Sequence, residues 1–239
     1  GRMHVIDGHP SCGGTPDDIW ITTRATESNF MVSLLTIMHE AGHGIYNQGL
    51  PEAFRYQPAG NHLGMSVHES QSFMMEKQAG LHDAFLMHLA PLALEHFNIE
   101  SQEIADIDNF ISLLRWSEPS LIRIYADELT YPAHILLRYD LEKQIILGDV
   151  NAAEDLPELW REGIKSRLGI EPENPSEGCM QDVHWPIGAQ GYFPAYTLGS
   201  MIAAQLFQSA LKAHPQIPEE LGRGEFTSLF QWNRENIHQ

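Results

Sequence analysis

The residues with the clearest chemical potential are two histidines and a glutamate in the run His39-Glu40-Ala41-Gly42-His43. In an α-helix, positions four apart lie on one face, so the rings of His39 and His43 can reach the same ion. Glu40 lies beside that face, where its carboxylate can activate a water molecule instead of binding the metal. This spacing predicts a zinc site with Glu40 as the general base.

A catalytic zinc site takes three protein ligands and keeps a fourth position for water. No third histidine follows the run at the short metzincin spacing, so the third ligand must come from elsewhere. Glu69, in the run His68-Glu69-Ser70, lies near the start of the next expected helix and can face the pair. Its ordinary alternative is a solvated carboxylate at a helix N-terminus. On spacing alone, Glu52 and Glu76 are rivals for this position.

Two later segments are rich in polar and aromatic groups that could assist the reaction. They are residues 122–131, IRIYADELTY, and residues 178–185, GCMQDVHW, which continue to Tyr192 and Tyr196. Amide hydrolysis at zinc needs donors for the developing oxyanion, and His or Tyr side chains suit this role. Taken alone, each of these residues is more often a hydrogen-bonded structural group. Arg123 among carboxylates would ordinarily be an ion-pair partner.

Mostly helices must position these residues. Ser28 or Asn29 can cap a helix that stops near Gly49-Leu50-Pro51, because its apolar residues recur at helical spacing. The best strand candidate is Ile19-Trp20-Ile21-Thr22-Thr23, which is β-branched and aromatic. Further helices are expected at residues 66–91, 101–116, 119–148, 154–168 and from 196 to before 215, with a loop at 171–191. With no repeat and no linker, residues 1–239 are predicted to form a single, mainly α domain.

The composition excludes several classes of partner. The chain has 14 Lys and Arg against 32 Asp and Glu, a formal charge of −18, which argues against nucleic acid or an anionic membrane surface. No run of apolar residues is long enough to span a membrane. Two cysteines are too few for a disulfide framework in a chain of this length, and the first residues lack the apolar region of a secretory signal. A cytoplasmic protein is expected.

Four motifs, in order, resemble those of the carboxypeptidase Taq family of zinc metallocarboxypeptidases. HEAGH resembles the zinc helix of the family, and HES follows with Glu69 twenty-six positions after His43. IRIYADELTY is similar to the motif I-R-x-x-A-D-E-x-x-Y, and GCMQDVHW to G-x-x-Q-D-x-H-W. The resemblance covers roughly residues 5–200 and implies Glu69 as the third zinc ligand.

The resemblance also implies an activity and a fold. It implies release of single residues from peptide C-termini by a helical zincin catalytic domain, with a small β element near the N-terminus. Zinc is the implied metal, with cobalt as a substitute, and peptides are the implied substrates. Frequent homodimers in the family imply a homodimer here.

Further site residues follow from the resemblance alone. Arg123 is implied to bind the terminal carboxylate of the substrate, where a bidentate guanidinium fits. The resemblance implies Tyr192 as a second carboxylate contact, and His184 and Tyr196 resemble the transition-state donors of the wider helical zincin group. Asp127 or Glu128 is expected to orient a zinc ligand.

Two motifs depart from the family pattern. The family sequence H-P-F is His9-Pro10-Ser11 here, so His9 remains a substrate-binding candidate. D-x-R-x-T appears as residues 18–22, DIWIT, with Trp20 in place of the arginine. Typical members are also much longer, which predicts a short form without the N-terminal helical half, whose open cleft a partner subunit completes.

Two alternative functions stay open at this point. A cleft without one wall and a pocket without its usual arginine are compatible with a zinc endopeptidase or oligopeptidase. The chain could also be an inactive zinc-binding scaffold. Retention of Glu40, His184 and Tyr196 speaks against a scaffold, since binding zinc requires none of them.

Overall fold

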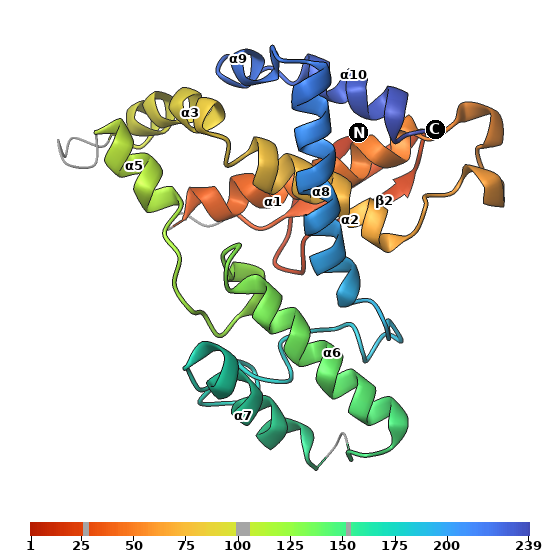
Figure 1. Cartoon of the computed structure of the whole chain (residues 1–239), viewed down its shortest axis with the longest axis vertical. Coiled ribbons are helices and arrows are strands. Elements are labelled where there is room, and N and C mark those ends of the chain that lie inside the picture. The colour runs from red at the N-terminus through yellow and green to blue at the C-terminus, as the bar shows by residue number, and fades with distance from the viewer. Residues whose placement is uncertain (26–28, 99–105, 152–153) are drawn as a thin grey trace. The chain divides into compact units, whose positions relative to one another are not determined.

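Helices make up most of the chain, and one small sheet lies near the N-terminus (Figure 1). The computed structural model describes residues 1–25, 29–98, 106–151 and 154–239. The chain divides into two compact units, Gly1–Arg115 with Leu198–Gln239, and Trp116–Thr197. The mainly α fold with a small β element is confirmed. The single domain stays a prediction, because two such units can belong to one domain.

The sheet of the first unit has three strands, β1 (Arg2–Val5), β2 (Ser11–Thr15) and β3 (Asp18–Thr23). β3 is central, parallel to β1 and antiparallel to β2. β3 is the predicted strand. β1 and β2 were not predicted, because glycines and prolines interrupt this part of the sequence.

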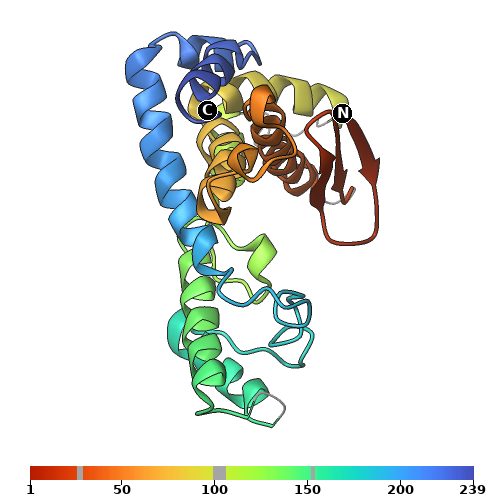
Figure 2. The same cartoon turned by 90° about the vertical axis from the view of Figure 1, so that its right-hand side faces the viewer.

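Helix α1 (Phe30–Gly49) carries the HEAGH run and has the predicted bounds. The Asn29 side chain caps it by accepting a hydrogen bond from the backbone N–H of Val32, at 3.2 Å. Ser28, the other expected cap, lies outside the described residues. The helix ends before Pro51, since the residue preceding a proline is disfavoured in the helical region. α1 packs against the sheet, whose dark red strands lie beside it in Figure 2.

The expected single helix over residues 66–91 is wrong. The structure has α2 (Met65–Phe73), a π-helical turn η3 (Met74–Ala79) and, after a break, α3 (Asp83–His96). The His82 ring caps α3 by accepting from the N–H of Ala84. α2 and η3 pack along α1, whereas Ala90 and Ala93 of α3 belong to a cluster that contacts Phe30 at the start of α1. Helical periodicity on both sides of Gly80 hides this break from sequence analysis.

The first unit also contains further helices that follow α3 in the chain. α5 (Ile107–Leu114) packs on α3, and residues 99–105, where part of the expected helix falls, are outside the described residues. α8 (Pro194–Ala213) matches the expected last long helix. α9 (Ile217–Leu221) and α10 (Thr227–Asn236) were not predicted. Short 3-10 turns η1 (Glu52–Phe54) and η2 (Pro58–Gly60) connect α1 to α2.

The second unit is built on two helices, α6 (Tyr131–Leu147) and α7 (Leu156–Leu168), which lie side by side in Figure 1. Their core consists of Leu137, Leu141, Trp160 and Ile164. The helix expected from residue 119 begins only at Tyr131, and the IRIYADELTY motif instead forms a 3-10 turn, η4 (Arg123–Tyr125), and a loop. The predicted loop at 171–191 is confirmed.

Both helices of this core end at a glycine in the left-handed region. The φ angles are 77° at Gly148 and 73° at Gly169, a conformation that side chains with a Cβ disfavour. Within the described part of the chain, no helix is both long and apolar enough to cross a bilayer.

Close backbone packing holds α2 in place within the first unit. A Cβ added to Gly42 of α1 would lie 2.4 Å from the carbonyl oxygen of Gln71 and 2.7 Å from the Cα of Ser72. A Cβ added to Gly199 of α8 would lie 2.6 Å from the Cβ of Glu69. Both neighbouring helices therefore approach α2 more closely than any residue but glycine allows.

We predict that Gly42→Ala destabilises the chain although alanine is the better helix former. Alanine favours a helix by about 1 kcal/mol over glycine, but its methyl group would meet backbone atoms, and overpacking of this kind costs about 1–3 kcal/mol. Gly44→Ala is the matched control, since its methyl group would meet side-chain atoms of Ile19 and Cys12 at 3.0 and 3.8 Å. Urea unfolding of both metal-free variants measures the difference. Equal stabilities would contradict the tight contact.

Candidate metal centre

Two helices bring three potential ligands together. His39 and His43 project from α1, and Glu69 projects from α2. The Glu69 Oε2 atom lies 3.5 Å from Nε2 of His39 and 3.6 Å from Nε2 of His43. All three ligand atoms lie within 4.8 Å of one another, the one such group among the described residues. In a tetrahedral zinc site with bonds of about 2.0–2.1 Å, ligand atoms lie roughly 3.4 Å apart, so the spacing suits zinc.

The donor set also has the chemistry of a catalytic zinc site. Two imidazole nitrogens and one carboxylate oxygen are three protein ligands, which leave a fourth position for water or substrate. Closed structural sites instead use four protein ligands, mostly cysteines. Glu69 is only 2% exposed, and a buried carboxylate needs a compensating charge such as a cation. The residues therefore fit zinc.

Glu40 lies in the same part of α1 and is buried. Burial raises the pKa of the Glu40 carboxyl to about 7, with the charge of His39 opposing and the charges of Glu69 and Glu76 adding to the rise. A bound divalent cation would lower this pKa again. Glu40 is not part of the cluster of ligand atoms. Its role as the general base stays a prediction.

The carboxylate of Glu76 supports His39 from the side opposite Glu69. The ring Nδ1–H of His39 donates to Glu76 Oε2 at 2.8 Å, and Lys77 pairs with the other Glu76 oxygen at 2.8 Å. Burial opposes the charged His39 ring, but the bond to Glu76 and the nearby carboxylates raise its pKa to about 9. The pKa of Glu76 falls to about 2, because Lys77 and His39 outweigh its burial. A metal must displace the proton from Nε2 of His39.

A second ring supports His43. The Nδ1 atom of His43 lies 2.5 Å from Nδ1 of His68, and Nε2 of His68 lies 2.9 Å from Oδ1 of Asn47. Burial, with the neighbouring histidines His39 and His68, lowers the pKa of His43, and burial with His62 and His39 lowers the pKa of His68 to about 4. Both rings are therefore neutral, as a ligand must be.

The structure separates the rivals for the third ligand. The Glu52 side chain is 85% exposed and lies 3.8 Å from Arg55. Glu76 holds the far side of His39 instead of joining the cluster. The Ser72 hydroxyl donates to Glu69 Oε2 at 3.2 Å, which helps to orient that carboxylate. Asn47 was not predicted as a site residue, although it lies four residues after His43 on the same helix face.

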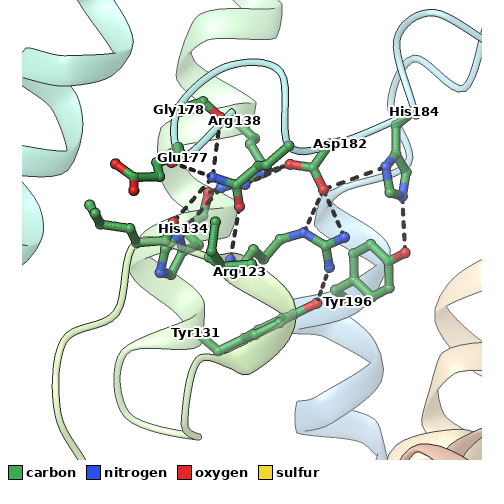
Figure 3. A network of polar contacts seen from close by, with 12 residues as sticks. Arg123, Tyr131, His134, Arg138, Glu177, Gly178, Asp182, His184 and Tyr196 are labelled. Atoms are coloured by element: carbon green, nitrogen blue, oxygen red, sulfur yellow. Dashed lines mark hydrogen bonds and ion pairs between the residues drawn. The ribbon is translucent and has the colours of Figure 1, made fainter. Parts of the chain in front are cut away.

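The second unit holds a buried ion network, drawn in Figure 3. Arg123 donates from Nε and Nη2 to one oxygen of Asp182, at 2.9 and 2.8 Å, and Arg138 donates from Nε to the other at 2.6 Å. Burial opposes the charged form of Asp182, but the two guanidinium groups outweigh it and lower its pKa. Tyr131 accepts from Nη1 of Arg123 at 2.8 Å. Arg123 is thus an ion-pair partner, the role expected of an arginine among carboxylates.

The two predicted transition-state donors meet in this network. Nε2 of His184 lies 3.0 Å from the hydroxyl of Tyr196 (Figure 3). The ring of His184 lies over Phe193, with centroids 4.4 Å apart, and 5.3 Å from the ring of Tyr192. Its Nδ1 atom lies 3.8 Å from Asp182. The IRIYADELTY and GCMQDVHW motifs therefore form one connected cluster in this unit.

Asp127, which we expected to orient a zinc ligand, accepts hydrogen bonds within its own unit. Its oxygens accept from the backbone N–H groups of Glu118, Leu129 and Thr130 and from the Thr130 hydroxyl. Glu76, His68 and Ser72 are side chains that contact the ligand residues in the first unit. These bonds shape the turn before α6, and the role of Asp127 or Glu128 in orienting a zinc ligand stays a prediction.

The two departing motifs lie on adjacent strands. Ser11 of β2 pairs with Thr22 of β3, and their hydroxyl oxygens lie 3.0 Å apart. The Trp20 ring lies against Gly13, where a Cβ would approach it to 2.5 Å. His9 is exposed, with its Nδ1 atom 2.6 Å from the carbonyl oxygen of Pro10. The role of His9 in substrate binding stays a prediction.

The described residues combine a mainly helical fold with a His-His-Glu cluster that could hold a metal ion. The model of the carboxypeptidase Taq (M32) metallopeptidase family matches residues 2–239, and the chain belongs to this family. Carboxypeptidase 1 of Bacillus subtilis is 41% identical over 221 residues, which are 92% of this chain and 44% of that protein. Thermostable carboxypeptidase 1 of Thermus thermophilus is 41% identical over 223 residues, 93% of this chain and 43% of that protein.

A solved structure agrees with this assignment. Trypanosoma cruzi metallocarboxypeptidase 1 superposes with a TM-score of 0.90 at 40% identity, over 100% of this chain and 49% of that one. The recognition of the family from its motifs is confirmed. The chain spans about half the length of the curated relatives it matches.

We predict that the chain binds one zinc ion per subunit, and that Glu69→Ala weakens binding by more than ~100-fold. Loss of a group that only orients a ligand costs about 10–100-fold in affinity, and loss of a ligand should exceed that. Glu52→Ala, at the exposed rival, should bind like the wild type. Metal analysis after dialysis and competition with a chromophoric chelator measure both. A Glu69→Ala protein of undiminished affinity would place the third ligand elsewhere.

Proposed function

We propose that this chain is the catalytic part of a zinc-dependent metallocarboxypeptidase that releases single residues from peptide C-termini. The His39, His43 and Glu69 cluster, with Glu40 buried beside it, is the observation that carries the proposal. Membership of the M32 family supports the choice of a peptide bond as the bond that is cleaved. The names of the B. subtilis and T. thermophilus relatives support carboxypeptidase activity.

Glu40 acts as the general base in this mechanism. The chemistry that a bound zinc ion supplies is polarisation of the peptide carbonyl and a lowered pKa of water. Glu40 takes a proton from the attacking water and passes it to the leaving amine. Its buried position beside the ligands strengthens its interaction with the charges that develop, since the local dielectric is low.

His184 and Tyr196 serve as donors to the developing oxyanion. Their mutual hydrogen bond of 3.0 Å supports the assignment, because each side chain orients the other. The ring contact of His184 with Phe193 restricts its rotation further. A donor that is already oriented loses less entropy in the transition state.

Arg123 and Tyr192 bind the terminal carboxylate of the peptide. Arg123 has five N–H groups, of which three donate to Asp182 and Tyr131, so a substrate must use the others. Asp182 offsets one positive charge while Arg123 and Arg138 carry two, and this excess favours an anion. The rings of Tyr196 and Phe193 cover the guanidinium at 4.9 and 5.8 Å.

We predict that Glu40→Gln abolishes turnover and keeps the metal. The substitution is nearly isosteric and removes the base, so activity should fall by several orders of magnitude. Activity above about a tenth of wild type, which is only ~1.4 kcal/mol of barrier, would assign the base to another residue. Glu95→Gln, an exposed carboxylate on α3, is the control.

The assay uses reconstituted protein, free-ended peptides and product masses. Stepwise loss of single C-terminal residues is the expected result. Internal fragments would instead indicate an endopeptidase. A wild-type chain that binds zinc and releases nothing would overturn the proposed function.

We predict that amidating the peptide C-terminus lowers kcat/KM strongly for the wild type and little for Arg123→Lys. The lysine keeps a positive charge in the network but loses the planar fork, so the contact that amidation removes is already weakened. Because Arg123 is buried, far-UV circular dichroism must first show that the variant folds. Equal penalties for both proteins would move the anchor to another residue, with Arg24 next.

Three expectations from the sequence stay predictions. They are a homodimer, a cytoplasmic location and substitution of cobalt for zinc. Sedimentation at micromolar concentration tests the first, and reconstitution with cobalt tests the last.

A further inference from the structure

Two different kinds of group support the two histidines of the metal cluster. His39 bonds to the carboxylate of Glu76, the usual partner of a histidine ligand. His43 instead faces another imidazole, that of His68. An imidazole can donate or accept, whereas a carboxylate only accepts. A further group is therefore needed to determine which of the two rings donates the hydrogen bond and which accepts it.

The direction of the hydrogen bond between His43 and His68 matters because only one nitrogen of His43 faces the cluster. Nε2 lies 3.6 Å from Glu69, whereas Nδ1 lies 2.5 Å from Nδ1 of His68. For Nε2 to bind a metal, its lone pair must be free and the hydrogen must sit on Nδ1. Two facing nitrogens share one hydrogen, so Nδ1 of His68 must then accept.

Asn47 supplies the missing direction. Its Oδ1 atom lies 2.9 Å from Nε2 of His68, and a carbonyl oxygen can only accept. The hydrogen of neutral His68 therefore sits on Nε2, which leaves its Nδ1 as the acceptor for His43. If the amide nitrogen of Asn47 faced His68 instead, both hydrogen bonds, between Asn47 and His68 and between His68 and His43, would reverse direction. Nε2 of His43 would then carry a hydrogen toward the metal.

We propose that Asn47 is a positioning residue that fixes, through His68, which nitrogen of His43 faces the metal. The proposal rests on the metal site described above and adds Asn47 and His68 to it. Asn47 follows His43 by four residues, as His43 follows His39, so all three side chains project from one face of α1.

His68 is the middle residue of the relay formed by Asn47, His68 and His43, and neighbouring rings pack around it. The ring of Tyr46 meets the ring of His68 edge to face at 5.3 Å, and the ring of His62 does so at 5.0 Å. Tyr46 is itself fully buried, and its hydroxyl accepts from the N–H of Leu63 at 3.2 Å. His68 is 8% exposed. Its ring cannot swing away from His43 without displacing this packing.

Two variants distinguish the effect of the hydrogen-bond acceptor at residue 47 from the effect of side-chain volume. Asn47→Leu keeps the volume and removes the acceptor, and Asn47→Asp keeps an acceptor. We expect zinc affinity to fall about 10-fold in Asn47→Leu, at the low end for residues that act through a ligand, and to be kept in Asn47→Asp. Gln48→Leu, at the exposed neighbouring position of α1, is the matched control and should bind like the wild type.

A second measurement reads the hydrogen positions in metal-free protein. Long-range ¹H–¹⁵N correlation spectra distinguish a ring nitrogen that carries hydrogen from one that does not, and a His43→Asn variant assigns the signals. We expect hydrogen on Nδ1 of His43 in the wild type and in Asn47→Asp, and both tautomers in Asn47→Leu. Because no metal is present, this measurement tests whether Asn47 sets the tautomer of His43 even if the chain does not bind zinc.

Three outcomes would overturn the proposal. One is a wild-type His43 with its hydrogen on Nε2. Another is an Asn47→Leu protein with the wild-type tautomer and affinity. The third is an Asn47→Asp protein that loses as much affinity as Asn47→Leu, which would reduce the role of Asn47 to packing.

Discussion

The metal site depends on the close contact of α1 with α2. Two histidines four residues apart can share an ion on any exposed helix, but the third candidate ligand, Glu69, lies close to them because α2 touches the backbone of α1. Gly42, between the two histidines, permits that contact, and Gly199 of α8 permits the contact on the other side of α2. The HEAGH run therefore contains both the candidate ligands and the glycine that allows α2 to pack closely against α1. One of its five residues sets the distance at which Glu69 lies from the imidazoles.

Charge balance explains the different partners of the two histidines. Around the cluster, Glu40, Glu69 and Glu76 are carboxylates, and Lys77 offsets one of them through its pair with Glu76. Two negative charges remain, as many as a divalent cation neutralises. A carboxylate behind His43 would add a third charge in a buried site, where an unpaired ion costs several kcal/mol. The neutral His68 orients the ring without that cost.

The sequence predicted the general fold and the three residues that meet in the cluster. Helical spacing pointed to His39 and His43, whereas Glu69 followed from the resemblance of its motif to that of the family. The bounds of α1 follow from a cap and a proline, and the cluster follows from helical spacing together with motif order. The break between η3 and α3 could not be predicted, since apolar residues recur on both sides of it. Nor could the late start of α6: Arg123 lies in a 3-10 turn because the side chain of Gln181 binds its backbone N–H at 2.8 Å, across 58 residues. Such long-range bonds leave no local pattern in the sequence.

The two arrangements of polar groups differ in what they demand of the fold. In the second unit, the hydrogens on Arg123 and Arg138 all point outward, and Asp182 can only accept, so the direction of each bond is fixed by residue type. In the first unit, His43 and His68 can each place a hydrogen on either nitrogen. Rigid packing alone cannot choose between those states, because both have the same shape. A group of fixed polarity must end the relay, and the carbonyl oxygen of Asn47 is such a group. A carboxylate such as Glu76 can orient a histidine by itself, whereas a neutral ring such as His68 needs one more residue, Asn47, to do so.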